Sequence, residues 1–216
     1  MDITMEKVMS SLVRNNMKPY FAETKNEVTP LISKLLHDGD SVAVGGSMSL
    51  FECGAIEHLR CGRYHFYDRY EHGLTDEDIR NIYLKSMDAD AYFCSCNAVT
   101  ESGELYNVDG NSNRICAISY GPKSVIMVVG KNKIVTDLSG AINRVKTITA
   151  PQICKKRRRN TYCKEKGSCI SISDGLSDMT SGCESPDRTC CNYLVSGKQR
   201  IKDRIKVILV GESMGY

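Results

Sequence analysis

The stretch SVAVGGS, residues 41–47, decides the fold class of this chain. Its first four residues have the small and β-branched side chains of a buried strand, and the two glycines that follow predict a turn. Residues 48–60 then have the apolar spacing of a helix. Strand, glycine turn and helix in this order form a βα unit, the building block of a parallel sheet.

The same alternation continues on both sides of this stretch. Apolar residues are spaced as on one face of a helix at 5–13 and 28–36, and Thr75 and Asp137 are expected to cap two further helices. Strands are predicted at 64–67, 91–94, 124–129 and 204–210. We therefore predict an α/β fold, a single domain over residues 1–216, with a mainly parallel sheet flanked by helices.

The composition is that of an ordinary globular protein. Of 216 residues, 41% are hydrophobic and 25% are charged, with a formal net charge of +3. So small a charge does not require a nucleic-acid partner. No apolar run approaches the roughly 20 residues that cross a bilayer, and the acidic residues Asp2 and Glu6 do not fit a secretory signal. We expect a cytoplasmic protein that is not embedded in a membrane.

Residues 151–202 interrupt the alternation and form a cysteine-rich excursion near the C-terminus. Six of the eleven cysteines lie there, and in a reducing compartment they indicate metal or redox chemistry rather than disulfides. Four of their thiolates could hold zinc or an iron–sulfur cluster: Cys163, Cys169, Cys183 and Cys190. Their spacing matches neither a zinc ribbon nor a bacterial ferredoxin, so free thiols in a mobile segment are the alternative.

Two short loops after predicted strands could bind an anion. Gly45, Gly46 and Ser47 expose backbone N–H groups and a hydroxyl before a helix, which suits a phosphate or carboxylate. A plain βα turn is the alternative, because the spacing is not that of a Walker loop or a dinucleotide fingerprint. Lys131 follows the strand at 124–129 and could pair with the same kind of anion, or it could be a solvated loop lysine.

A polar run over residues 97–114 follows the strand at 91–94, at the edge where α/β sheets bind ligands. It holds more amides and carboxylates than turns require, although turn formation is the alternative. We expect five of its side chains to converge in one pocket: Asn97, Glu101, Asn107, Asp109 and Asn113. A partly desolvated Asp109 could then act as a general base.

Other motifs give little support to further functions. The basic run at residues 155–159 has no aromatic platform, so we interpret it as a solvated charge run and consider nucleic-acid binding unlikely. The four histidines show no metal-ligand spacing, and no G-x-S-x-G elbow of a serine hydrolase occurs.

The segment from Ala89 to Val135, which includes NAVTESGELYNVDGNSNR, resembles the central segment of the LUD domain, the lactate-utilisation family. Residues 39–59, 141–152 and 205–216 support the resemblance. The family is similar in fold to the superfamily of ribose-5-phosphate isomerase, glucosamine-6-phosphate deaminase and CoA transferases. The resemblance thus implies the topology of the α/β fold.

The resemblance also implies roles for particular residues. The turn at residues 45–47 corresponds to one that many superfamily members use for a phosphate or pyrophosphate group. Glu101, with Gly103, resembles the Glu-x-Gly turn that carries the nucleophilic glutamate of CoA transferases. Five positions match the signature N-x-D-G-x-x-N-R and are expected to line the same cleft: Asn107, Asp109, Gly110, Asn113 and Arg114.

LUD proteins are associated with the oxidation of L-lactate to pyruvate, alongside iron–sulfur partners. The resemblance implies a protein that binds a small anionic metabolite at the C-terminal edge of the sheet and serves lactate or organic-acid utilisation. It would be a transferase- or isomerase-like enzyme or an oxidoreductase subunit, with iron–sulfur proteins as partners. The sequence does not fix its oligomeric state, and a homodimer is one assembly it could form. The alternative is a non-catalytic redox accessory protein that binds a metal or an iron–sulfur cluster through the C-terminal cysteines.

Overall fold

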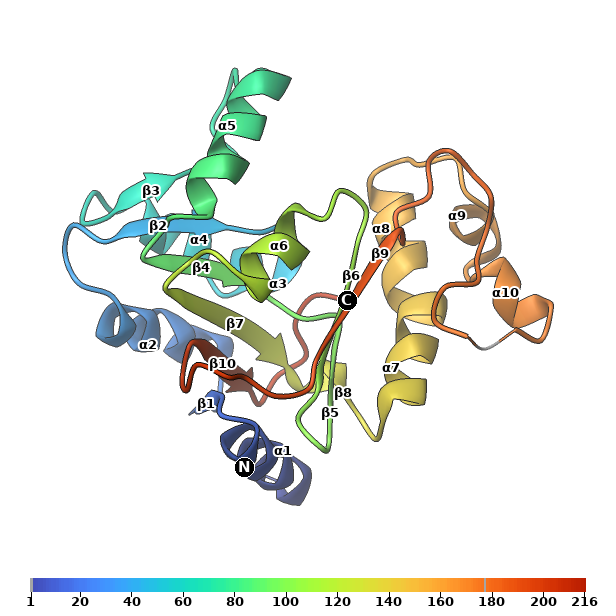
Figure 1. The fold of residues 1–216 in the computed structure, drawn as a ribbon, viewed down its shortest axis with the longest axis horizontal. Coiled ribbons are helices and arrows are strands. Elements are labelled where there is room, and N and C mark those ends of the chain that lie inside the picture. The colour runs from blue at the N-terminus through green and yellow to red at the C-terminus, as the bar shows by residue number, and fades with distance from the viewer. Residues whose placement is uncertain (1, 177) are drawn as a thin grey trace.

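The structure is a computed structural model that describes residues 2–176 and 178–216 (Figure 1). Its helices are α1 (Ile3–Arg14), α2 (Val28–Leu35), α3 (Met48–Glu52), α4 (Ala55–Leu59), α5 (Asp76–Ser86), α6 (Asn113–Ser119), α7 (Leu138–Arg144), α8 (Ala150–Lys156), α9 (Tyr162–Lys166) and α10 (Ile170–Ser173). Its strands are β1 (Lys18–Ala22), β2 (Ser41–Val44), β3 (His65–Tyr67), β4 (Ala91–Cys94), β5 (Ala98–Thr100), β6 (Leu105–Asp109), β7 (Ser124–Gly130), β8 (Ile134–Val135), β9 (Asn192–Ser196) and β10 (Ile205–Val210).

Six strands form one sheet in the order β1-β10-β7-β4-β2-β3, and every pair in it is parallel. The predicted α/β fold with helices around a parallel sheet is therefore confirmed. β7 lies between β10 and β4, and both faces of it are covered, which explains why its residues 125–129 are all apolar and buried. All six strands point the same way, so their carboxyl ends lie along one edge of the sheet.

Alternate residues of the strands build a separate core on each face of this sheet. In β7, Ile126 and Val128 pack with residues of α2, α3 and α4. Val125, Met127 and Val129 face the opposite side, where α1 and α6 cover them. The arrangement has three layers, and the period of two along each strand assigns each side chain to its layer.

The polar run at residues 97–114, expected to be one connection, instead contains two strands and the start of α6. β5 and β6 form an antiparallel hairpin within a second sheet of order β8-β5-β6-β9. The two strands are short, and the polar residues in and around them left no clear strand pattern in the sequence. One face of this second sheet packs on the long helix labelled α7 and α8 in Figure 1. Tyr106 and Val108 of β6 contact Val145 and Ala150 of that helix.

The cysteine-rich excursion packs on this second sheet. α7 and α8 are joined by a turn of π-helix, Val145–Thr149, and β9 returns from the excursion to pair with β6. The buried ammonium group of Lys146 donates hydrogen bonds to Ser171 Oγ, Ser181 Oγ and the Asp178 carbonyl. These bonds connect the π-helix to the excursion.

Two local details differ from the sequence expectation. The helix expected over 48–60 is divided at Gly54, whose φ of 72° ends α3 and begins α4. β1 at the sheet edge has few fully buried residues and carried no clear apolar pattern. Across the described part of the chain, helices long and apolar enough to cross a membrane are absent.

Candidate functional site

Two adjoining cavities lie where β2, β4 and β7 end. The larger has a volume of about 320 Å³ and is lined by the loops after these three strands and by α8. The smaller, of about 220 Å³, lies between the start of α6 and the segment around Thr189. Gly46, Arg114, Ile153 and Arg157 line both. We call the two cavities together the basic cleft.

The charge of this cleft is strongly positive. Its acidic side chains are Asp109 and Asp187. Its cationic side chains are Arg69, Arg114, Lys133, Lys156, Arg157, Arg159 and Arg188. Such an excess of positive charge in a concave site attracts anions.

The glycine turn lies at the centre of the cleft. A Cβ atom on Gly45 would lie 2.7 Å from the Tyr92 hydroxyl and 3.2 Å from Cδ of Arg114, so only glycine fits there. Gly46 lines both cavities, and a Cβ atom there would lie 3.5 Å from an Arg157 nitrogen. Ser47 lines the larger cavity, and its hydroxyl oxygen is buried without a hydrogen-bond partner in the described residues.

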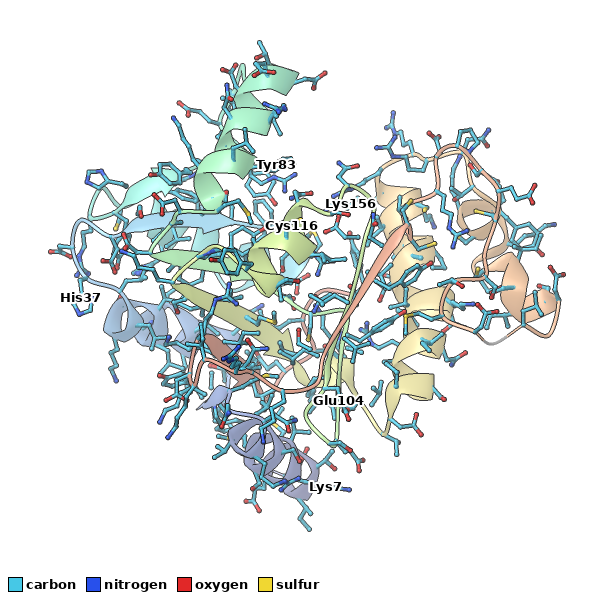
Figure 2. The ribbon with its side chains drawn as sticks, viewed as in Figure 1. Lys7, His37, Tyr83, Glu104, Cys116 and Lys156 are labelled. Atoms are coloured by element: carbon cyan, nitrogen blue, oxygen red, sulfur yellow. The ribbon has the colours of Figure 1, made fainter. Side chains whose placement is uncertain are left out.

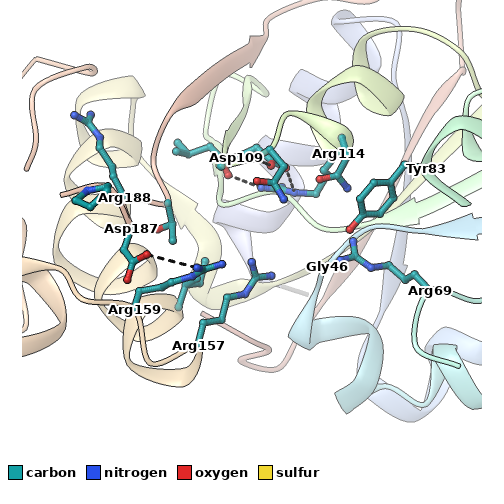
Figure 3. A pocket seen from close by; sticks show the side chains of 16 residues that line it. Gly46, Arg69, Tyr83, Asp109, Arg114, Arg157, Arg159, Asp187 and Arg188 are labelled. Atoms are coloured by element: carbon teal, nitrogen blue, oxygen red, sulfur yellow. Dashed lines mark hydrogen bonds and ion pairs between the residues drawn. The ribbon is translucent and has the colours of Figure 1, made fainter. Parts of the chain in front are cut away.

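Two arginines lie close to this turn from opposite sides (Figure 3). Arg157 comes from the end of α8, and Arg69 follows β3 with its guanidinium group 4.8 Å from the ring centre of Tyr83. Neither arginine forms an ion pair with an acidic residue in the described part of the chain. Nε of Arg69 is buried and lacks a hydrogen-bond partner there. Both guanidinium groups therefore have donors to offer a ligand.

Arg114 is fully engaged with the protein. Nη1 donates to the Ser95 carbonyl and to Oδ1 of Asn107 at 3.1 and 2.7 Å. Nη2 donates to Oδ1 of Asn97 and the Val108 carbonyl at 3.2 and 2.6 Å. Nε lies 3.3 Å from Oδ2 of Asp109. Arg114 thus joins the loop after β4 to β6 and shapes the wall of the cleft.

The polar residues of β6 and α6 surround this arginine. Oδ1 of Asp109 accepts hydrogen bonds from the backbone N–H groups of Asn111 and Ser112, which orders the start of α6. Asp109, Gly110 and Asn113 line the smaller cavity. Gly110 packs closely on the chain around Thr189, because a Cβ atom there would lie 3.3 Å from the Thr189 carbonyl oxygen.

Two of the predicted asparagines, Asn97 and Asn107, lie at different depths. Asn97 lines the larger cavity, and its Oδ1 also accepts a 2.7 Å hydrogen bond from the Val108 N–H. Asn107 is completely buried behind Arg114, and its Nδ2 has no hydrogen-bond partner in the described residues. Asn107 therefore supports the cleft without lining either cavity.

Lys133 is the buried cation of the larger cavity. It lies in the 3-10 turn Lys131–Lys133 that follows β7, and only 3% of it is exposed. Its Nζ donates to Oγ of Ser49 and Oγ of Ser95, both at 3.0 Å. Burial lowers the pKa of this amine to about 8, because a charged ammonium is poorly solvated there.

Four residues predicted for this site line neither cavity: Gly45 and Asn107, which are packed behind its wall, and Glu101 and Lys131, which lie elsewhere. Glu101 is in the β5–β6 turn beside α1, where its carboxylate pairs with Nζ of Lys7 at 2.6 Å. Figure 2 shows Lys7 far from Lys156, which lines the larger cavity. Lys131 is exposed, and its backbone N–H donates to the Glu212 carbonyl. The structure thus brings Asn97, Asp109 and Asn113 to the cleft but not Glu101 or Lys131.

The four cysteines expected to bind metal line a third, small cavity, together with Tyr106 and Tyr193. Of the cysteines in this region, Cys163, Cys169, Cys183 and Cys190 are all free thiols. Within residues 2–176 and 178–216, no three cysteine, histidine or acidic side chains are arranged to hold one metal ion. The fold gathers the four thiols around this cavity, and their role as metal ligands stays a prediction.

A fifth cysteine of this region, Cys154, has a thiol with a lowered pKa. Cys154 lies on α8, and its sulfur is 3.4 Å from Oγ1 of Thr189. The neighbouring thiol of Cys163 is the main cause that lowers the pKa of Cys154. Its partner Cys163 has a raised pKa for the same reason.

Of the seven cationic side chains of the cleft, sequence reasoning predicted only Arg114, and three of those it missed are Arg157, Lys133 and Arg69. Arg157 belongs to the basic run that we interpreted as solvated, and only the packing of α8 turns it toward Gly46. Lys133 could have been predicted as a site residue, because it follows β7 in the same turn as Lys131. Arg69 lies two residues beyond β3, at the same edge of the sheet, and that position could have indicated it.

Comparison with known proteins agrees with this fold. The model of the LUD domain family matches residues 5–210. A solved DUF162 family protein from Deinococcus radiodurans is 17% identical, with 96% of each chain covered and a TM-score of 0.54. A solved eIF2B beta from Chaetomium thermophilum is 12% identical over 62% of this chain and 43% of that chain, with a TM-score of 0.37. No curated protein sequence matches the chain.

The family resemblance read from the sequence is confirmed by this match. The Deinococcus structure adds agreement in fold along nearly the whole chain, and its low identity carries no statement about ligands. Because the family model matches most of its length, this protein belongs to the LUD domain family.

Proposed function

We propose that this protein binds a small organic anion, such as a carboxylate or a phosphate ester, in the basic cleft. Membership of the LUD domain family supports a role related to lactate utilisation. The observation that carries the proposal is the pair of guanidinium groups on Arg69 and Arg157, which lie on either side of Gly46 without acidic partners in the described residues.

The neighbouring groups suit an anion of this size. Gly46 lets a ligand approach the backbone after β2, and the buried hydroxyl of Ser47 supplies a further donor. Lys133 provides a cation at the inner wall of the larger cavity. Asp109 and Asn107 act as positioning residues, because they hold Arg114 rather than face the ligand with free groups.

A thermal-shift screen tests the proposal. Inorganic phosphate, L-lactate, pyruvate and coenzyme A are compared at equal ionic strength, so that screening of surface charge is the same in each sample. A ligand at 100 times its dissociation constant stabilises a protein by about 2.7 kcal/mol, which raises the melting temperature visibly.

Two variants locate the bound anion. Arg157→Gln should weaken binding by about tenfold or more, since a charge-assisted hydrogen bond contributes about 1.5–3 kcal/mol. Arg158→Gln is the matched control, because Arg158 is the next residue and lines neither cavity. Equal losses in both variants, or no stabilisation by any of the anions, would refute the proposed function.

A further inference from the structure

One amine in the basic cleft is placed unlike its other cations. Nζ of Lys133 is buried at the inner wall of the larger cavity, and its two hydrogen-bond acceptors, Ser49 Oγ and Ser95 Oγ, are both neutral. No acidic side chain in the described part of the chain forms an ion pair with it. A lysine that served only to balance a charge in the fold would be expected to have an acidic partner.

The same placement makes this amine nucleophilic. A buried ammonium loses its proton more readily than a solvated one, and the pKa of Lys133 is lowered to about 8. Near neutral pH a useful fraction of Lys133 is therefore the free amine, the form that attacks carbonyl carbon. The arginines of the cleft stay charged at every physiological pH and are suited to the carboxylate of the same molecule.

We propose that Lys133 forms a Schiff base with the carbonyl group of a small oxo acid whose carboxylate is held by Arg157. The proposal rests on the proposed function, because it assigns a chemical class to the anion in the same cleft. Both residues line the larger cavity, as does Ser47, whose unpaired hydroxyl is available to the carbonyl oxygen or the leaving water.

The step balances without an added oxidant or reductant. The Nζ lone pair attacks the carbonyl carbon, and a proton moves from nitrogen to oxygen to give a carbinolamine. The carbon–oxygen bond then breaks, the oxygen leaves as water, and a carbon–nitrogen double bond remains. The side chains of Ser49 and Ser95, both at 3.0 Å from Nζ, are close enough to relay the proton.

Reductive trapping tests the proposal. The full-length protein is incubated with pyruvate and sodium borohydride, and its intact mass and peptide map are measured. We expect one reduced pyruvate adduct, located on Lys133. L-Lactate is the matched probe, because it carries the same carboxylate with a hydroxyl in place of the carbonyl and should leave no adduct.

Variants decide the site of reaction. Lys133→Met should lose the adduct, whereas Lys131→Met should keep it, since Lys131 is an exposed lysine of the same turn. Lys133→Arg keeps the positive charge but cannot form an imine, so it should bind L-lactate and give no adduct. If Lys133→Met fails to fold, this arginine variant and the wild-type peptide map still give the answer.

The outcomes separate the two proposals. Labelling spread over exposed lysines, or unchanged labelling in Lys133→Arg, would overturn the Schiff base. Stabilisation by L-lactate and pyruvate without any adduct on Lys133 would also overturn it while leaving the proposed function intact. Absence of stabilisation by both anions would refute the proposed function, and the Schiff base would fall with it.

Discussion

Gly45 lies against the hydroxyl group of Tyr92, so closely that a Cβ atom on Gly45 would be 2.7 Å from that oxygen. Tyr92 lies on β4, and Gly45 directly follows β2, the parallel strand that pairs with β4. The glycine of the βα turn is therefore fixed by packing against the next strand. Its neighbour Gly46 faces the cleft and has open space by comparison.

Because of this contact, we expect a substitution at Tyr92 to restore part of the stability that a substitution at Gly45 removes. Gly45→Ala should lower the free energy of unfolding by about 1–3 kcal/mol, as for other overpacked sites. Adding Tyr92→Phe removes the nearest atom and should return part of this loss, measured as a coupling in a double-mutant cycle by urea unfolding. Gly46→Ala is the control and should unfold like wild type. Strictly additive effects of Gly45→Ala and Tyr92→Phe would contradict the contact.

Arg114 should be the most costly residue of the cleft to remove. Arg114→Met leaves Oδ1 of Asn107 without its donor and removes one of the two donors to Oδ1 of Asn97, so we expect a loss of about 3 kcal/mol or more in unfolding free energy. Arg80→Met is the control, since Arg80 is exposed and its change should stay within about 0.5 kcal/mol. Similar stability of the two variants in chemical unfolding would mean that the network contributes little.

The buried amine of Lys133 makes stability depend on pH. Its pKa is about 8 in the folded protein and has an ordinary value of 10.5, so between these values the unfolded chain binds the extra proton. The cost of burying the charge is therefore complete below pH 8 and is relieved as the pH rises toward 10.5. Wild type should gain up to about 3 kcal/mol relative to Lys133→Met over this range.

Urea unfolding of both proteins across that range measures the difference, and the titration of other groups cancels in it. Lys131→Met is the control and should follow wild type, because its ammonium is exposed. A pH-independent difference between wild type and Lys133→Met would contradict the lowered pKa.

Glu101 should be dispensable for ligand binding. Its carboxylate pairs with Lys7 at the α1 side of the molecule and lines neither cavity. Glu101→Gln should leave the ligand-induced thermal shift unchanged and lower stability by no more than about 1 kcal/mol, because the pair is exposed. Loss of the thermal shift in Glu101→Gln, with the fold intact, would show that the hairpin turn takes part in the site.

The cysteine-lined cavity predicts a low metal content. Since no three donors in the described part of the chain are arranged around one ion, we expect zinc and iron far below one atom per chain in anaerobically purified protein. Elemental analysis and an absorption spectrum measure this. One equivalent of metal that Cys163→Ser loses and Cys61→Ser retains would show that the thiols rearrange to bind it; Cys61 is an exposed control.

Local patterns in the amino-acid sequence were enough to predict the parallel sheet and the family. Apolar strand residues, such as those of 41–44 and 124–129, and the helices between them repeat with periods that local chemistry imposes, so β2, β7 and α2 could be predicted. The glycine turn at residues 45–47 was also predictable, because its position between strand and helix is itself a local pattern. The polar run at residues 97–114 could be matched to the family by its sequence motif alone, which does not require the directions of its side chains.

Which charged groups form the cleft depends on long-range packing. Glu101 and Asp109 lie in one polar run, yet the β5–β6 hairpin sends the first toward α1 and the second toward α6. Arg69 and Arg157 are far apart in sequence, and each meets Gly46 only because β3 ends beside β2 and α8 packs on the second sheet. Long-range packing sets these distances, so they cannot be predicted from the local pattern of residue types.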